Sequence, residues 1–304
     1  MPENKNIKFA FFGSSRFSVI VLDELEKQGV IPSLVITTPD KPQGRKMTIT
    51  PNPVKAWAQE RKINVYDPAK LDAALISKLK DEVNKNAPTA NINVFIVASY
   101  GKIIPQAVLD IPSKKTLNIH PSLLPKYRGA SPLQAAILDD AKDTGVTIME
   151  IDADMDHGPL VVQENIHINE WPCYEDFEEF MAKKGADLLA GVLADWTQDK
   201  IIAKAQNHDS ATFTKKTKKE DGLIDFELMK PNSTASPADQ YVTFRKIQAF
   251  HEWPQAFFMI DHGGKSIRVK ITKASWNGKL TIEKVIPEGS KEMTYDSFLR
   301  GYLS

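Results

Sequence analysis

The chain has 304 residues, of which 42% are hydrophobic and 26% charged, a balance typical of a globular protein long enough for two domains. Its 39 basic and 39 acidic residues cancel, which argues against a generic polycationic nucleic-acid binder. One cysteine, Cys173, leaves no disulfide framework, and no segment is long and apolar enough to cross a bilayer. With a polar amino terminus as well, we expect a cytoplasmic protein without a membrane anchor.

Strand-like and helix-like segments alternate through the first part of the chain. We predict strands at residues 7–12, 31–37, 64–66, 93–98 and 116–119. Between them we predict helices at 17–28, 54–61 and 71–83, and one beginning near 105. This alternation predicts an α/β fold with a mostly parallel, Rossmann-like sheet flanked by helices. Gly13 is the single glycine of the first loop, so the dinucleotide fingerprint is missing, which weighs against a nicotinamide-dependent oxidoreductase.

The later part of the chain changes character. Two further strands at 145–152 and 160–168 and a long helix at 174–196 complete the α/β pattern. The polar stretch 198–210 is interpreted as a linker. Beyond it come short β-rich runs and one helix, at 256–260, 266–274, 280–286 and 238–250. The expected domains are therefore 1–197, catalytic, and 211–304, a small β-rich domain resembling a barrel.

Three polar residues form the candidate catalytic group. Asn118 and His120 lie two apart on a strand that ends at Pro121, so both side chains lie on one face at the edge of the sheet. Asp156 lies in the loop between the next two strands, which returns it toward them. An amide and an imidazole can donate to an oxygen that gains negative charge when an amine attacks a carbonyl, while a carboxylate orients the imidazole.

Each member also has a structural interpretation. His120 alone is consistent with a satisfied structural histidine, Asn118 with a loop cap, and Asp156 with a turn. A metal could be held by His120, Asp156 and His157, but their spacing lacks a compact ligand signature. We therefore expect no metal.

Residues 118–125, 127–132 and 145–152, together with Asp156, resemble the formyltransferases that use 10-formyltetrahydrofolate. More narrowly, the chain is similar to the branch of that family that acts on methionyl-tRNA, and the resemblance covers nearly all of it. It implies that Asn118, His120 and Asp156 are catalytic. It also implies folate contacts from two segments, Ser122, Leu123, Leu124 and Pro125 in one and Tyr100 and Gly101 in the other.

The same resemblance implies contacts with tRNA. Arg45 ends a loop, 38–45, that matches the acceptor-stem loop of the tRNA enzymes, and the carboxyl-terminal domain is implied to be an OB-like barrel that helps to hold tRNA. Four lysines near its start form a basic cluster suited to phosphate contact: Lys215, Lys216, Lys218 and Lys219. A solvated charged face is the alternative, since residues 206–304 hold only 15 basic against 12 acidic residues.

The chain departs from the family pattern in two places: Ser14-Ser15 replaces a Thr-Pro pair, and His157 stands where a small residue is common. The function expected from the resemblance is formyl transfer from 10-formyltetrahydrofolate to the amino group of initiator methionyl-tRNA, by a monomer. The alternatives are a formyltransferase acting on an amino-sugar nucleotide and, outside enzymes, an RNA-binding protein that retains a decayed enzyme fold.

Overall fold

The computed structural model describes residues 7–43, 48–83, 92–230 and 232–303. They cluster into two compact units that interleave along the chain. The first unit comprises residues 1–128, 145–166 and 179–213, and the second comprises 129–144, 167–178 and 214–304. The segment 198–210, predicted to be a linker, clusters with the first unit.

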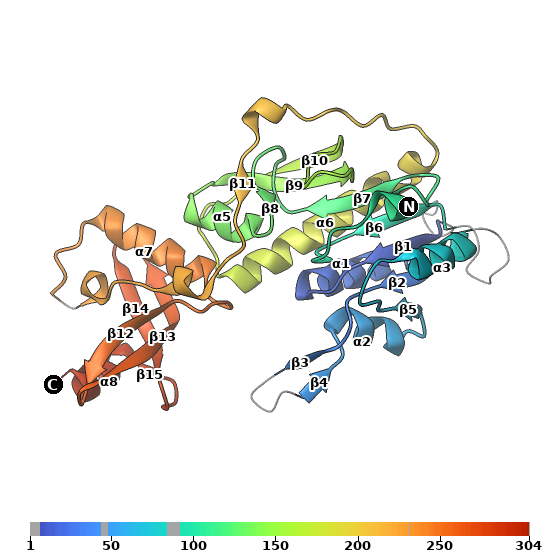
Figure 1. The fold of residues 1–304 in the computed structure, drawn as a ribbon. Helices are drawn as coiled ribbons and strands as arrows, with labels where there is room; N and C mark the ends of the chain where they lie inside the picture. The colour runs from blue at the N-terminus through green and yellow to red at the C-terminus, as the bar shows by residue number, and fades with distance from the viewer. Residues whose placement is uncertain (1–6, 44–47, 84–91, 231, 304) are drawn as a thin grey trace. The chain divides into compact units, whose positions relative to one another are not determined.

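A seven-stranded sheet forms the centre of the first unit, in the order β10–β9–β7–β6–β1–β2–β5 (Figure 1). Its strands are β1 (Phe9–Phe12), β2 (Leu34–Ile36), β5 (Asn64–Tyr66), β6 (Val94–Val97), β7 (Thr116–His120), β9 (Asp143–Glu150) and β10 (Leu160–His167). The pairs from β7 to β5 are all parallel, whereas β9 pairs antiparallel to β7. The predicted mostly parallel sheet is confirmed.

Helices follow these strands as the alternation predicts. They are α1 (Arg16–Lys27), α2 (Pro53–Glu60), α3 (Ala73–Val83), α4 (Gln106–Leu109) and the long α6 (Tyr174–Thr197). Two short elements were not predicted: a hairpin of β3 (Lys41–Gln43) with β4 (Thr48–Thr50), and a ribbon of β8 (Arg128–Gly129) with β11 (Phe213–Thr214). The carboxyl ends of β1, β6 and β7 point the same way because these strands are parallel, so the loops that follow them share one edge of the sheet.

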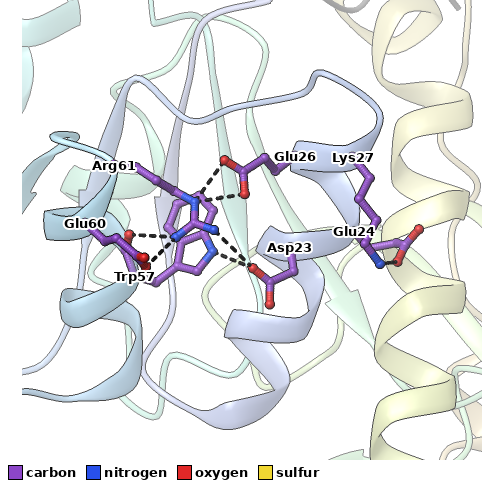
Figure 2. Close-up of polar contacts among 7 residues, drawn as sticks. All are labelled: Asp23, Glu24, Glu26, Lys27, Trp57, Glu60 and Arg61. Atoms are coloured by element: carbon purple, nitrogen blue, oxygen red, sulfur yellow. Dashed lines mark hydrogen bonds and ion pairs between the residues drawn. The ribbon is translucent and has the colours of Figure 1, made fainter.

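A cationic side chain ties α1 to α2. The Arg61 Nε atom lies 2.8 Å from Glu26 Oε2, and the guanidinium lies 4.2 Å from the centre of the Trp57 ring (Figure 2). The Trp57 indole in turn donates to Asp23 Oδ1 at 2.7 Å. These contacts are partly exposed, so each contributes on the order of 1 kcal/mol or less. Together they hold α1 against α2, which packs beside β2 and β5.

The second unit is built around a four-stranded antiparallel sheet in the order β12–β13–β14–β15. The strands are β12 (Phe257–His262), β13 (Lys265–Trp276), β14 (Leu280–Pro287) and β15 (Met293–Thr294). Its helices are α5 (Pro132–Leu138), α7 (Pro237–Ala249) and α8 (Tyr295–Tyr302), and α5 packs on α7. The β-rich carboxyl-terminal part is confirmed, but α5 and α8 were not predicted. Within the described residues, no helix has both the length and the apolar character of a membrane span.

Candidate active site

His120 ends β7, and each of its ring nitrogens faces an oxygen acceptor. It is 4% exposed. Its Nδ1 lies 3.6 Å from Asp156 Oδ1, and its Nε2 lies 3.0 Å from the carbonyl oxygen of Tyr127. A carbonyl oxygen only accepts, so Nε2 carries a proton. A second proton on Nδ1 would face the carboxylate, and the site therefore offers the charged imidazole a partner on each side.

Asn118 lies two residues earlier on the same strand face. Its side chain is half-buried, and among the described residues its amide makes no hydrogen bond. Ile119 occupies the opposite face, where α6 approaches so closely that a Cβ on Gly185 would lie 2.4 Å from Ile119 Cγ2. Because α6 covers that face, Asn118 and His120 point to the other one. An uncommitted amide donor thus lies beside the His120–Asp156 pair.

The loop that carries Asp156 is bent back onto β9. Asp156 has φ 48°, a left-handed conformation that costs a residue other than glycine on the order of 1 kcal/mol. Two residues later, a Cβ on Gly158 would lie 2.0 Å from the carbonyl oxygen of Glu150, so only glycine fits there. The backbone N–H of Glu150 donates to the Pro159 carbonyl at 2.9 Å and closes the loop. This bend brings Asp156 back to His120, as the sequence predicts.

The turn at Ser122–Pro125 is rigid. Thr147 on β9 donates its hydroxyl to the Ser122 carbonyl at 2.6 Å, and Gln163 on β10 donates to the Leu124 carbonyl at 2.9 Å. Ser122 is fully buried, and its own hydroxyl donates to the Lys126 carbonyl at 2.7 Å. Leu124 is buried as well, whereas Leu123 and Pro125 are half-buried. A ligand would therefore meet Leu123, Pro125 and backbone at this turn.

Tyr100 and Gly101 follow β6 on the same sheet edge, and their roles differ. The Tyr100 ring is 2% exposed and packs edge-on to Phe12, and burial raises the pKa of its phenol to about 12. Gly101 is exposed and has φ 77°, a conformation that favours glycine. Any ligand contact here would come from the backbone around Gly101, while the Tyr100 side chain belongs to the core.

The Ser14-Ser15 departure has a structural explanation. Ser15 is the N-cap of α1 and accepts from the Ser18 N–H, as is typical for serine at this position. The Ser14 hydroxyl donates to the Tyr100 carbonyl at 2.9 Å. The pair thus starts the first helix and ties the loop after β1 to the loop after β6.

The other departure, His157, lies beside Asp156 and makes contacts that the sequence did not predict. Its Nδ1 lies 2.6 Å from Asp152 Oδ2, and its ring stacks on His208 with 4.0 Å between centres. His208 Nδ1 accepts from Arg128, and Arg128 also donates to Gln206. Arg128 lies in a motif quoted for the resemblance, but Gln206 lies in the predicted linker and carried no local signal.

The structure describes only some of the residues that are proposed to contact tRNA. Arg45 lies outside the described residues. The four lysines of the basic cluster, Lys215, Lys216, Lys218 and Lys219, are all exposed. In the part of the chain that the structure describes, none of the four makes an ion pair. Their charges are therefore available to an anionic partner.

A second group of ligand-type side chains lies in the second unit. Single atoms of Cys173, Glu175 and His251 lie within 4.8 Å of one another. His251 Nδ1 contacts both oxygens of Glu175, at 2.8 and 2.7 Å, and its Nε2 lies 3.1 Å from the Thr272 carbonyl oxygen. Both ring nitrogens of His251 therefore have partners, and burial raises the pKa of the Cys173 thiol to about 11. An ion pair explains this group.

Comparison with known proteins points to one enzyme family. Residues 5–193 match the family model described as Formyl transferase. A methionyl-tRNA formyltransferase of a Sulfurihydrogenibium species is 35% identical over 272 residues, which cover 89% of this chain and 82% of that protein. A methionyl-tRNA formyltransferase of a Hydrogenobaculum species is 39% identical over 221 residues, which cover 73% of this chain and 70% of that protein.

Solved structures share the fold at lower identity. An N-formyltransferase from Helicobacter canadensis, solved with folinic acid and dTDP-3-aminofucose, aligns with a TM-score of 0.59 and 19% identity over 89% of this chain and 88% of that one. HypX from Aquifex aeolicus, in complex with tetrahydrofolic acid, aligns with a TM-score of 0.61 and 16% identity over 97% of this chain and 48% of that one. At these identities the likeness shows the fold alone.

Proposed function

Because this chain belongs to the formyl transferase family, and within it to the methionyl-tRNA formyltransferases, we propose that it moves the formyl group of 10-formyltetrahydrofolate to the α-amino group of initiator methionyl-tRNA. The observation that carries the site assignment is the contact of His120 with Asp156 at the end of β7, beside the uncommitted amide of Asn118. When an amine attacks a formyl carbon, the reaction requires groups of this kind.

The amine of methionine forms a bond to the formyl carbon, whose oxygen becomes an anion. The Asn118 amide and the His120 imidazole donate to that oxygen and stabilise it. The bond from the carbon to N10 of the folate then breaks. The proton lost by the amine passes to N10 by way of His120 and Asp156, so that formyl-methionyl-tRNA and tetrahydrofolate leave. The proposed steps need no nucleophilic side chain and no metal ion.

In this mechanism the two ring nitrogens of His120 have different roles. Its ring nitrogens contact the Tyr127 carbonyl and Asp156, and only the second contact, at 3.6 Å, is longer than a hydrogen bond. A substrate oxygen can therefore compete for Nδ1 more readily than for Nε2. The looser contact is the one that serves the reaction, and the tighter contact holds the ring.

The substrates would reach this centre over neighbouring loops. The rigid turn at Ser122–Pro125 and the backbone at Gly101 border the same sheet edge, which supports a folate site there. The exposed lysine cluster, together with Arg45, supports contact with tRNA phosphates. We also propose a monomer in a reducing compartment, the cytoplasm, which the lone half-buried Cys173 supports.

The test is a reaction with 10-formyltetrahydrofolate and charged initiator methionyl-tRNA. We expect formyl-methionyl-tRNA and tetrahydrofolate in equal amounts. Elongator methionyl-tRNA tests tRNA choice, and an amino-sugar nucleotide tests the alternative substrate. Formylation of the amino sugar alone would reject the proposed function, and so would tetrahydrofolate release without any formylated product.

A further inference from the structure

A buried glutamine holds the loop that carries Asp156. Gln206 is 5% exposed, and its Nε2 donates to the carbonyl oxygens of Asp156, at 2.9 Å, and of Gly158, at 2.7 Å. A primary amide has two N–H donors, so both are spent on this loop. The two bonds hold the backbone on both sides of His157. They therefore lie next to Asp156, whose backbone conformation is strained.

Arg128 fixes the direction in which Gln206 points. It is 3% exposed, and it donates to Gln206 Oε1 from Nε at 3.2 Å and from Nη2 at 2.6 Å. A guanidinium can only donate. Turning the amide over would place its N–H groups against the guanidinium and remove the Gln206 donor from the partly buried Asp156 carbonyl and the buried Gly158 carbonyl, and the loss at the buried carbonyl costs about 1 to 3 kcal/mol. Only one orientation of the Gln206 amide is therefore stable.

The other contacts of the network brace the same loop. Gly158 closes against the Glu150 carbonyl with no room for a side chain. On the far side, His208 accepts from Arg128 at 2.9 Å and stacks on His157. The strained residue thus lies between a tightly packed glycine, a stacked histidine and the Gln206 amide. Residues in such conformations persist when their surroundings hold them, and they concentrate at functional sites.

We propose that Gln206, oriented by Arg128, is a positioning residue that aims the Asp156 carboxylate at His120. This inference rests on the proposed role of Asp156 in formyl transfer. Gln206 touches no reacting atom in that scheme and acts only through the backbone of residues 156–158. Its removal would let the loop relax from the left-handed conformation and carry the carboxylate away from the imidazole, and a misplacement of about 1 Å can cost about 100-fold in rate.

Gln206→Glu tests the proposal because it keeps the shape and the acceptor that Arg128 needs but removes both donors. We expect kcat to fall about 10-fold to 100-fold with little change in KM for the folate. In a chain that already carries Asp156→Asn, the same substitution should cost nothing further, because the residue it serves is gone. The exposed Gln198→Glu is the matched control, and its kcat should equal that of the unmodified chain.

Amide hydrogen exchange gives a readout that needs no substrate. In Gln206→Glu we expect faster exchange in the peptide spanning residues 151–160 and unchanged exchange in β1 and β6. An unchanged kcat would overturn the proposal. So would an equal fold-loss in the Asp156→Asn background, or faster exchange spread over the whole unit, because either result marks a purely structural role. If the unmodified chain formylates no methionyl-tRNA, the proposed function fails, while the exchange result still decides whether Gln206 holds the loop.

Discussion

The two units each contain a histidine paired with a carboxylate, and the pairs differ in how tightly they close. In both, one ring nitrogen faces the carboxylate and the other a backbone carbonyl. His251 contacts Glu175 at 2.8 and 2.7 Å, whereas His120 lies 3.6 Å from Asp156. The carboxylate of the tight pair comes from the first turn of α6, while that of the loose pair comes from a residue with strained backbone.

The difference separates a structural ion pair from a candidate catalytic one. The tight pair satisfies its own hydrogen bonds and leaves nothing for a ligand. The loose pair keeps a gap at Nδ1 and lies beside the uncommitted amide of Asn118. Residue type alone does not distinguish them, since both are histidine with a carboxylate. The distance, the backbone conformation and the neighbouring donor do.

Replacing the histidine of each pair should give opposite results. His120→Gln removes the proton carrier and one oxyanion donor, so we expect kcat to fall about 10³-fold to 10⁴-fold. His251→Gln, the matched control, should keep kcat within about twofold, because His251 contacts Glu175 and the Thr272 carbonyl of the second unit. Both are measured as formyl-methionyl-tRNA formed in a single turnover. Comparable losses in the two variants would erase the distinction between the pairs.

Replacing Asn118, the amide beside the loose pair, should give the second-largest loss of turnover. Asn118→Ala removes a donor to the developing oxyanion, and we expect turnover to fall about 10²-fold to 10³-fold. Asn118→Asp keeps the size of the side chain but cannot donate when ionised, so it should lose at least as much. Circular dichroism checks that both variants fold. A folded Asn118→Ala protein with the original turnover would remove Asn118 from the mechanism.

The second unit should contribute to substrate binding rather than to chemistry. Lys215→Ala with Lys216→Ala removes two exposed positive charges. If both lysines neutralise phosphates, KM for tRNA should rise several-fold, and its dependence on salt should become shallower by about 0.7 to 0.9 in log–log slope for each phosphate left without its lysine. Lys70→Ala, an exposed lysine of the first unit, is the control. A fall in kcat at saturating tRNA would place these lysines in the chemistry instead.

The sequence predicted the positions of candidate site residues that depend on local structure. The strand ending at His120 places Asn118 on the same face through a period of two, and this could be predicted because Pro121 stops the strand. The return of Asp156 could be predicted because its loop joins two neighbouring strands. Both results required only contacts that the order of elements along the chain dictates.

What could not be predicted depends on tertiary contacts. Gln206 lies in a polar stretch without periodicity, and its role comes from bonds to residues 48 and 50 positions earlier. Tyr100 lies next to an exposed glycine, and only packing against Phe12 shows that its ring is in the core. Helix α8 is different, because its signal is local and was missed: Tyr295, Phe298, Leu299 and Tyr302 have helical spacing behind the N-cap Thr294.

The smallest expected effect concerns the stability of the second unit. Glu175 raises the pKa of His251 above its usual 6.5, and His251 and other hydrogen bonds lower the pKa of Glu175 below its usual 4.5 although burial opposes this. The histidine contribution is complete below its unfolded pKa and is lost as pH rises through the raised value. The carboxylate contribution is complete above its unfolded pKa and is lost as pH falls through the lowered value.

The pair should therefore stabilise the second unit most between pH 4.5 and 6.5, the usual values of its two members. We expect Glu175→Gln to lower Tm by about 2 to 4 °C at about pH 5.5, and by less at about pH 9, because the histidine contribution is lost as pH rises through the raised pKa of His251. Calorimetry at the two pH values measures the difference. Asp143→Asn is the control, because the His167–Asp143 pair is 60% and 88% exposed and water screens its charges. An equal loss of Tm at both pH values would show that Glu175 acts through packing, and the tight pair would then differ from the loose one in shape rather than in charge.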